Sequence, residues 1–162
     1  MEKSAASTVL VVRLTPLMVI EPLRAIYRAS AAGVEIDLIV RGMCALRPGV
    51  PGLSDNIRVR SVIGRLLEHA RVYYFYNGGA EDVYIASADW MGRNFFNRIE
   101  TATPVLDPAL KARVIREGLE LALADTAKAW QMDGDGGYHR IRPAQGEAPA
   151  GVQETLLAEY AC

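Results

Sequence analysis

Two apolar stretches separated by an amphipathic one occupy the first forty residues, and this order restricts the fold more than any other feature of the sequence. "STVLVVRL" (residues 7–14) is a continuous, β-branched run of the kind found in buried strands, and "VEIDLIV" (34–40) is predicted to be a second strand. "EPLRAIYRASAAG" (21–33) predicts a helix between them, with Pro22 in its first turn and Gly33 at its end. Two strands joined through a helix pair in parallel, so this part of the chain predicts an α/β fold.

The middle of the chain predicts that the sheet continues. After a loop rich in proline and glycine, strands are expected at residues 57–64, 70–77, 81–89 and 97–105, with a helical turn at 65–69 ("RLLEH") and a long amphipathic helix at 107–130. Asp107 is a plausible N-cap of that helix. These elements predict an α/β domain with a mixed sheet flanked by helices.

The composition changes after residue 130. Residues 131–151 are rich in glycine, proline and charge, which is typical of an arm or tail, and "VQETLLAEYAC" (152–162) predicts a short last helix. We therefore expect one domain at residues 1–130 and a C-terminal arm at 131–162.

The overall composition excludes several classes of protein. A formal net charge of −1 gives no sign of a nucleic-acid or membrane partner, and the 162 residues suit one domain with a core of its own. The two cysteines, Cys44 and Cys162, form neither a disulfide framework nor a metal-ligand pair, which predicts a cytoplasmic protein. The N-terminal apolar run is interrupted by Arg13 and Pro16 and is too short to span a membrane.

Arginine is used selectively in the middle of the chain. All eight basic residues between positions 41 and 98 are arginine. Guanidinium groups form planar, two-pronged hydrogen bonds that suit phosphate, so this bias favours a polyanionic ligand. A solvated surface is the alternative that composition leaves open.

Several familiar site motifs are absent. The sequence has no P-loop and no G-x-G-x-x-G after its first strand, "DGDGG" lacks the glutamate that would complete a calcium loop, and the two histidines lack the partners of a zinc site. Seven polar residues remain near expected strand ends or turns: Arg41, His69, Arg71, Asn77, Ser87, Asp89 and Arg93. A histidine beside arginines can accept a phosphoryl group or transfer a proton while the arginines neutralise phosphate charge. A structural histidine beside an apolar strand explains His69 equally well at this point.

Long strings of this sequence resemble a known family. "LIVRGMCALRPGVPGLSDNIRVRS" (38–61) and "SADWMGRN" (87–94), within a match from about residue 25 to about residue 138, are similar to the C-terminal domain of bacterial polyphosphate kinases of the first type. The resemblance implies a phospholipase D-like fold. It also implies reversible transfer of the terminal phosphate of ATP to polyphosphate through a phosphohistidine, with Mg²⁺.

The resemblance also implies roles for individual residues. Arg41 falls on the arginine that binds nucleotide phosphates, and His69 falls on a second active-site histidine that contacts ATP and handles a proton. Arg71, Arg93 and Asn77 are expected to line the site. The phosphorylated histidine, the magnesium ligands and the tyrosine that contacts the base belong to an upstream part of the family, with no counterpart here.

The expected partners follow from the same resemblance. They are ATP or ADP, polyphosphate and the upstream domains of a longer enzyme, with a possible homo-oligomer and no nucleic acid. Alone, the 162-residue chain is expected to have little or no kinase activity.

Two other functions stay open. In a homodimeric phosphodiesterase of the phospholipase D type, two copies of His69 would pair, but that family's H-x-K-x4-D motif has Arg71 in place of lysine and Tyr76 in place of aspartate. A non-catalytic polyanion-binding domain would need only an anion pocket around Arg41. Before residue 25 the family's K-x-N-x-L-x-D pattern is replaced by "VRLTPLMVIEP", so the exit of the first strand lacks its asparagine and acidic residue.

Overall fold

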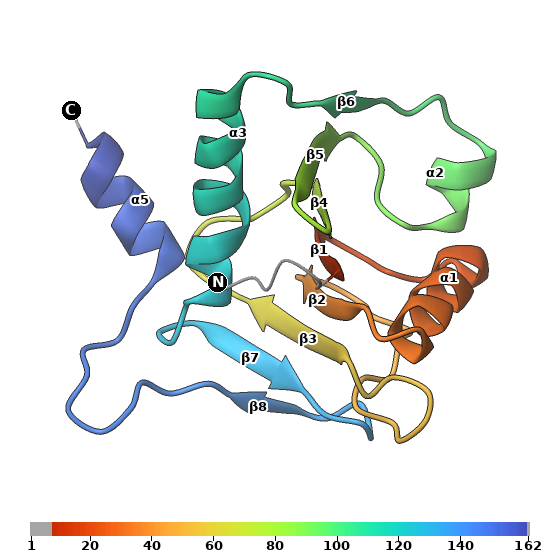
Figure 1. Ribbon diagram of the computed structural model, residues 1–162. Coiled ribbons are helices and arrows are strands. Elements are labelled where there is room, and N and C mark those ends of the chain that lie inside the picture. The colour runs from red at the N-terminus through yellow and green to blue at the C-terminus, as the bar shows by residue number, and fades with distance from the viewer. Residues whose placement is uncertain (1–7, 162) are drawn as a thin grey trace.

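Eight strands form one mixed sheet in the order β6-β5-β4-β1-β2-β3-β7-β8, as the computed structural model shows for residues 8–161, the part of the chain that it describes (Figure 1). The strands are β1 (Thr8–Leu14), β2 (Glu35–Val40), β3 (Ile57–Val62), β4 (Val72–Asn77), β5 (Ala80–Ala86), β6 (Ala102–Pro104), β7 (Ala129–Met132) and β8 (Tyr138–Arg140). The predicted α/β fold with a mixed sheet is confirmed.

The strand directions bring many strand ends to one edge of the sheet. β1, β2 and β3 are parallel, whereas β4 runs antiparallel to β1 and β7 antiparallel to β3. The register pairs Arg13 near the end of β1 with Val72 at the start of β4, and Val62 at the end of β3 with Ala129 at the start of β7. We call this side, where the three parallel strands end, the C-terminal edge. Ligands of parallel sheets bind at this kind of edge.

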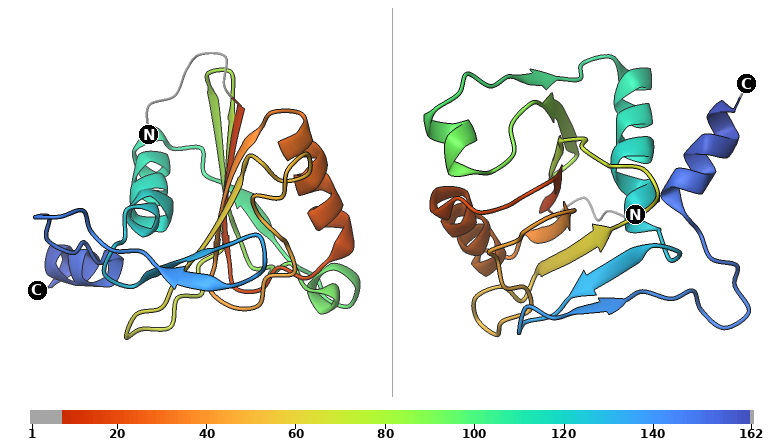
Figure 2. Two further views of the ribbon diagram at one scale, coloured as in Figure 1. Left: turned by 90° about the horizontal axis from the view of Figure 1, so that it is seen from below. Right: turned by 180° about the vertical axis from the view of Figure 1, so that it is seen from behind.

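Helices cover both faces of the sheet. They are α1 (Ile20–Ala31), α2 (Gly92–Phe96), α3 (Pro108–Ile115), the π-helical turn η1 (Arg116–Glu120), α4 (Leu121–Leu123) and α5 (Val152–Tyr160). Helix α1 lies on one face, and α3 and α5 lie on the other (Figure 2).

The alternation of side chains along β1 creates a core on each face. Val12 and Leu14 pack in the cluster that includes Ile26 of α1, while Val9 and Val11 pack in the cluster that includes residues of η1, α4 and α5. Successive side chains of a strand point to opposite faces, so a strand buried on both sides is apolar throughout. This explains why β1 is apolar from Val9 to Val12.

The long helix predicted at residues 107–130 is too long at its C-terminal end. It begins as expected, because Asp107 Oδ1 accepts a hydrogen bond from the Leu110 amide at 2.8 Å. It ends at Leu123, however, and Asp125 then accepts hydrogen bonds from the backbone amides of Lys128 and Val152 at 2.6 and 2.8 Å. A buried aspartate that bonds two non-helical amides stabilises a turn at this point.

Residues 129–140 belong to the sheet. The expected boundary after residue 130 falls inside β7, which pairs with β3 on one side and with β8 on the other. The segment that composition assigned to an arm therefore contributes two strands, and the expected short last helix is observed as α5.

The predicted helical turn at residues 65–69 is also wrong, because residues 63–71 form an irregular loop. The Gln153 side chain bonds both backbone groups of Leu66, accepting from its amide and donating to its carbonyl at 2.9 Å each. A side chain from a distant helix thus satisfies the backbone groups that a helical turn would have paired locally.

Candidate active site

A buried ion pair occupies the C-terminal edge at β4 and β5. Arg71, just before β4, donates from Nε to Asp89 Oδ1 at 3.0 Å and from Nη2 to Asp89 Oδ2 at 2.8 Å. The side chain of Asp89 is 5% exposed and that of Arg71 is 15% exposed. Two parallel N–H···O bonds fix both the distance and the plane of the guanidinium group.

Asp89 also connects this pair to the end of β1. Its Oδ1 accepts a hydrogen bond from the Thr15 backbone amide at 3.0 Å. Burial tends to raise the pKa of Asp89, but the Arg71 and Thr15 hydrogen bonds outweigh it, and the net result is a pKa below the usual value. The carboxylate is therefore ionised and serves to orient Arg71.

His69 lies against this pair and is open to solvent. Its Nε2 is 2.6 Å from Arg71 Nη2 and 3.5 Å from Asp89 Oδ2, and its side chain is 53% exposed. An arginine can only donate, so a hydrogen bond at this contact requires Nε2 to be the acceptor. If Nε2 were protonated, it would lose the Arg71 bond and face the Asp89 carboxylate instead. His69 thus has one neighbour for each protonation state.

The aromatic residues next to this site fix the segment that carries Asp89. Trp90 Nε1 donates to Tyr73 Oη at 3.1 Å, and Tyr73 Oη donates to the Ala88 carbonyl at 2.9 Å. Backbone hydrogen bonds also join Trp90 to Pro16 and Met18 beyond β1. These contacts explain why an apolar tryptophan follows the aspartate: it anchors the strand exit to the core.

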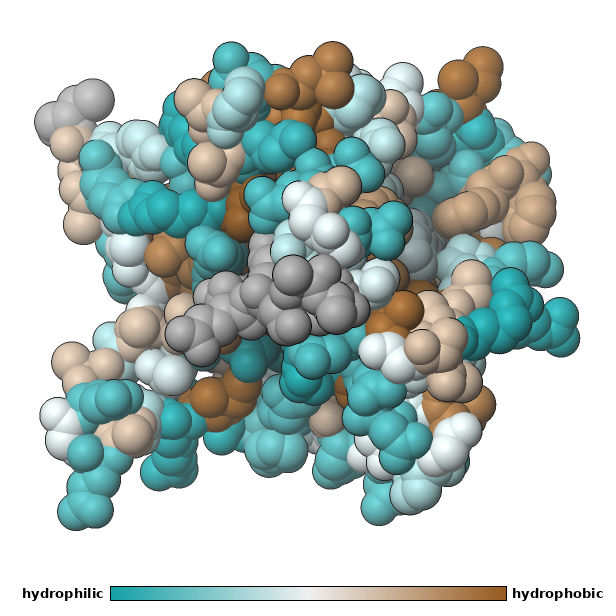
Figure 3. Space-filling model, viewed as in Figure 1, coloured by the Kyte–Doolittle hydropathy of each residue, from teal (hydrophilic) through white to brown (hydrophobic). Residues whose placement is uncertain are grey.

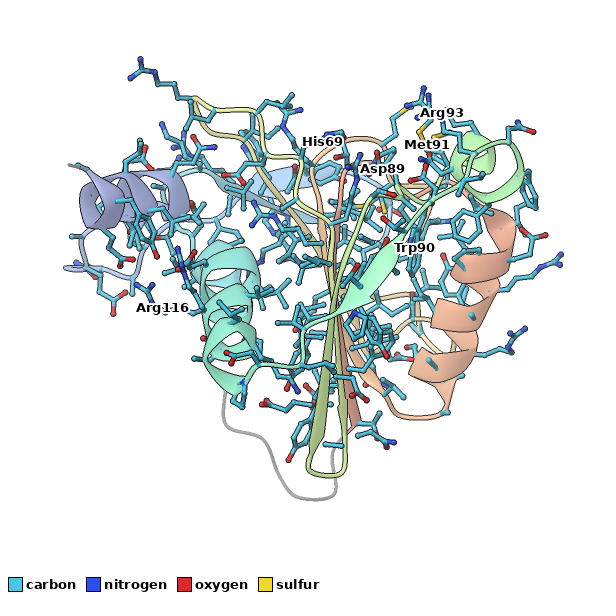
Figure 4. All side chains as sticks on the ribbon, turned by 90° about the horizontal axis from the view of Figure 1, so that it is seen from above. His69, Asp89, Trp90, Met91, Arg93 and Arg116 are labelled. Atoms are coloured by element: carbon cyan, nitrogen blue, oxygen red, sulfur yellow. The ribbon has the colours of Figure 1, made fainter. Side chains whose placement is uncertain are left out.

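Arg93 shares this side of the molecule, and Asn77 does not. Figure 4 shows Arg93 and Met91 on the same outer side as His69 and Asp89, with Arg93 at the start of the short helix α2. Asn77 ends β4, where it pairs with Thr8 and Ala80 at the opposite edge of the sheet. A six-residue strand spans about 17 Å, so the structure does not bring Asn77 to the other candidates.

Arg41 lies two strands away on the same edge, directly after β2. It lines an open hollow of ≈ 290 Å³ together with Ser61, Ile63, Trp130 and Tyr138. Its Nε is buried and has no hydrogen-bond partner among the described residues, and no carboxylate there forms an ion pair with its side chain. Arg41 therefore keeps its charge available for a ligand.

A second network holds the loop that leads to His69, and sequence reasoning missed it. Gln153 Nε2 donates to Glu68 Oε1 at 2.9 Å, and Glu68 also forms an ion pair with Arg13. Arg13, although charged, is 5% exposed and donates from Nη1 to the Gly118 carbonyl at 2.8 Å. An arginine inside a predicted buried strand was the available signal, because a buried charge needs a partner.

Ser87 is committed to a separate contact. Its hydroxyl donates to Glu100 and accepts from the Thr101 amide at 3.0 Å, while Asn94 donates to the other Glu100 oxygen at 2.6 Å. These hydrogen bonds, that of Ser87 first and that of Asn94 second, lower the pKa of Glu100. Ser87 and Asn94 thus fix the connection between β5 and β6.

Comparison with known proteins identifies the family to which this domain belongs. The family profile described as polyphosphate kinase C-terminal domain 2 matches residues 2–153. The chain belongs to the polyphosphate kinase family. The polyphosphate kinase of Neisseria gonorrhoeae is 70% identical over 139 residues, and that of Burkholderia cenocepacia is 54% identical over 151 residues.

The fold of the polyphosphate kinase domain is likewise shared. The crystal structure of the polyphosphate kinase from Porphyromonas gingivalis matches with a TM-score of 0.89 and 43% identity over 94% of this chain and 23% of that chain. The chain covers 20% of the Neisseria relative and 22% of the Burkholderia relative, so it spans about a fifth of the curated relatives that it matches. The similarity to a polyphosphate kinase domain predicted from residues 38–61 and 87–94 is confirmed.

The described part of this polyphosphate kinase domain offers no metal site of its own. No group of three or more histidine, cysteine, aspartate or glutamate residues within residues 8–161 could hold an ion, and both oxygens of Asp89 already accept from Arg71 or Thr15. The described residues thus provide no cluster that would hold Mg²⁺ by protein ligands alone. Cys162 lies outside the described residues. No helix in that part is both long and apolar enough to cross a membrane.

Proposed function

We propose that this domain forms one side of a phosphoryl-transfer site that moves the terminal phosphate of ATP reversibly onto polyphosphate. The observation that carries the proposal is that His69 and the uncommitted Arg41 share one edge of the sheet. Membership in the polyphosphate kinase family supplies the substrates. Catalysis of phosphoryl transfer depends on positioning and on stabilising the charge of the phosphate oxygens, which this edge can provide.

Arg41 is proposed to bind phosphates of ATP and polyphosphate. Its guanidinium lines an open hollow and faces no carboxylate among the described residues. Arginine binds phosphate through paired hydrogen bonds whose charge does not titrate in the working pH range. Binding of this kind stabilises negative charge that develops on the leaving ADP or, in the reverse direction, on the leaving polyphosphate.

His69 is proposed to hold or transfer a proton at Nε2. In the structure this nitrogen accepts from Arg71 and lies beside Asp89, while the ring edge is exposed to solvent. A protonated imidazole can donate to the oxygen of a departing phosphate, and the neutral form can then recover its bond from Arg71. Arg71 and Asp89 act through His69 as positioning residues, and Arg93 adds a cation at the rim.

The upstream part of the family is proposed to supply what this chain lacks. The described residues contain no magnesium site, so the metal ligands and the phosphorylated histidine are expected in upstream domains that face this edge. ATP as substrate and the free Cys44 thiol are consistent with a cytoplasmic location.

Turnover by a full-length polyphosphate kinase carrying this domain tests the proposal. We expect His69→Gln and Arg41→Ala each to lower the rate of ATP-dependent polyphosphate synthesis by about 100-fold or more, with Arg24→Ala on the far side of α1 as the control. Robust synthesis by the 162-residue chain alone, lost in His69→Ala, would contradict the proposed dependence on upstream domains.

The two other functions give different outcomes in the same assays. Hydrolysis of a phosphodiester dye would support the homodimeric phosphodiesterase, but Arg71 is held by Asp89 where that motif requires a lysine. Polyphosphate binding that Arg41→Ala abolishes, without turnover in the full-length protein, would identify a non-catalytic binding domain.

A further inference from the structure

The C-terminal edge carries further cations beyond Arg41, on and beside β7 and β8. Lys128 directly precedes β7, Arg140 ends β8, and Arg142 follows two residues later. Because β3, β7 and β8 are adjacent, Arg140 is three strand positions from Arg41, or about 14 Å. We call Arg41, Lys128, Arg140 and Arg142 the basic strip.

Hollows in the surface connect these cations. The Arg41 hollow shares Ile63 and Trp130 with a second hollow of ≈ 360 Å³ that Lys128 and Arg140 complete. The second shares Arg140 with a third, of ≈ 480 Å³, that lies between the start of β7 and the segment after β8; its lining residues are Thr126, Ala127, Arg140, Ile141, Arg142, Pro143 and Pro149. The segment after β8 projects at the lower left of the molecule in the common view of Figure 1 and Figure 3. Each hollow thus shares at least one lining residue with the next.

The cations of the basic strip face no acidic partner. Within residues 8–161, the ion pairs of the structure involve other arginines and His69, and none involves a member of the strip. The acidic side chain next to Lys128 is Asp125, which is 1% exposed and occupied by the Lys128 and Val152 amides. Arg140 donates from Nη2 to the Ala127 carbonyl at 2.5 Å, which orients its guanidinium without neutralising it.

We infer that the basic strip binds a stretch of polyphosphate that extends away from the reacting end. This inference rests on the proposed function, in which Arg41 binds phosphates at the site itself. Cations spaced along neighbouring hollows suit an extended anion with one charge per repeat better than a single phosphate. The third hollow has no aromatic side chain on which a nucleobase could stack, whereas Trp130 and Tyr138 line the first. The third hollow is therefore the part of the strip that favours polyphosphate over single-stranded nucleic acid.

The strip has a functional consequence for chain length. A polyphosphate long enough to reach Lys128 and Arg142 gains contacts that a tripolyphosphate lacks. Those contacts slow dissociation between transfers, so long chains are bound more tightly and elongated more processively than short ones.

Binding measurements on the 162-residue chain test this inference. The probes are tripolyphosphate and a long-chain polyphosphate, and the test variant is Lys128→Gln/Arg142→Gln, which leaves the Arg140–Ala127 hydrogen bond intact. Its matched control is Arg24→Gln/Arg28→Gln, which removes two exposed charges from α1. We expect the test variant to weaken binding of the long chain about 3- to 10-fold, with a shallower salt dependence, and to leave tripolyphosphate binding unchanged.

The outcomes separate this inference from the proposed function. Unchanged long-chain binding in the test variant, or an equal loss in the control, overturns the inference that the basic strip binds polyphosphate. The proposed role of Arg41 does not depend on either result. Unchanged tripolyphosphate binding in Arg41→Ala overturns the proposed role of Arg41 instead. An equal fold-loss for single-stranded DNA would show a general polyanion surface and overturn the assignment to polyphosphate. A loss of binding that is caused by misfolding is excluded by requiring that every variant has the circular dichroism spectrum of the unaltered chain.

Discussion

Arg71 and Arg41 lie on the same sheet edge, about 10 Å apart by strand spacing, in opposite electrostatic environments. Arg71 is held by two hydrogen bonds to Asp89, and its side chain is 15% exposed. Arg41 has no carboxylate partner among the described residues and opens onto a hollow. One arginine is part of the internal structure of the site, and the other is available to a ligand.

Under the proposed function, this difference lets one edge both position a reacting group and bind charge. The half at β4 and β5 has paired its charges, so its geometry around His69 is fixed before any substrate arrives. The half at β2, β3 and β7 has left its cations unpaired, so it gains stabilisation only when an anion binds. Substitutions in the first half should therefore affect stability most, and those in the second half should affect binding most.

The largest expected loss of stability comes from Asp89→Asn. It removes the charge that compensates Arg71 in a largely buried position, and we expect the free energy of unfolding to fall by about 2–3 kcal/mol. Urea denaturation of the 162-residue chain measures this. Asp82→Asn, at an exposed position of β5, is the control and should change stability by less than about 0.5 kcal/mol. Equal losses of stability in Asp89→Asn and Asp82→Asn would contradict the claim that the Arg71–Asp89 ion pair stabilises the fold.

The same ion pair predicts how stability depends on pH. The pKa of Asp89 is lower in the folded state than in the unfolded chain, so its contribution is present above the unfolded value of about 4 and is lost as the pH falls through the folded value. The stability difference between the unaltered chain and Asp89→Asn should be constant from pH 7 to about pH 5 and then shrink. If the stability difference already shrinks between pH 7 and pH 5, its pH dependence comes from a titrating group other than Asp89.

A smaller loss is expected from Gln153→Ala. The Gln153 side chain is buried and bonds Leu66 twice and Glu68 once, so its removal should cost about 2 kcal/mol and loosen residues 63–68, next to His69. Hydrogen exchange of the Leu66 amide reports the loosening directly. Gln131→Ala on β7, whose side chain makes none of these bonds, should leave that amide protected.

The smallest effect on stability is expected from Arg41→Ala. Because the side chain has no ion-pair partner to lose, the free energy of unfolding should change by less than about 0.5 kcal/mol. Tripolyphosphate binding should nevertheless weaken by about 10-fold or more, as isothermal titration would show. A large loss of stability would mean that Arg41 is a structural residue, like Arg71.

The elements that sequence predicted best are those with strong local signals. The apolar runs of β1 and β2 and the Asp107–Pro108 start of α3 are observed where they were expected. The long helix was extended too far because Ala124–Trp130 continues an apolar, alanine-rich pattern, while its end depends on Asp125 bonding the distant Val152 amide. Asn77 was grouped with His69 because both flank the same strand, but opposite ends of a strand lie at opposite edges of a sheet.

The sequence by itself determined the parallel β1–β2 pair, the resemblance to polyphosphate kinases, and which arginines follow strands. Apolar periodicity and long strings that resemble a family are local properties of a chain, so they can be recognised without its fold. Only the tertiary structure decided which of those arginines are paired, because Asp89 reaches Arg71 across 18 residues and Gln153 reaches Leu66 across 87. It also placed Lys128, Arg140 and Arg142 beside Arg41, since the pairing of β7 with β3 brings distant segments to one edge.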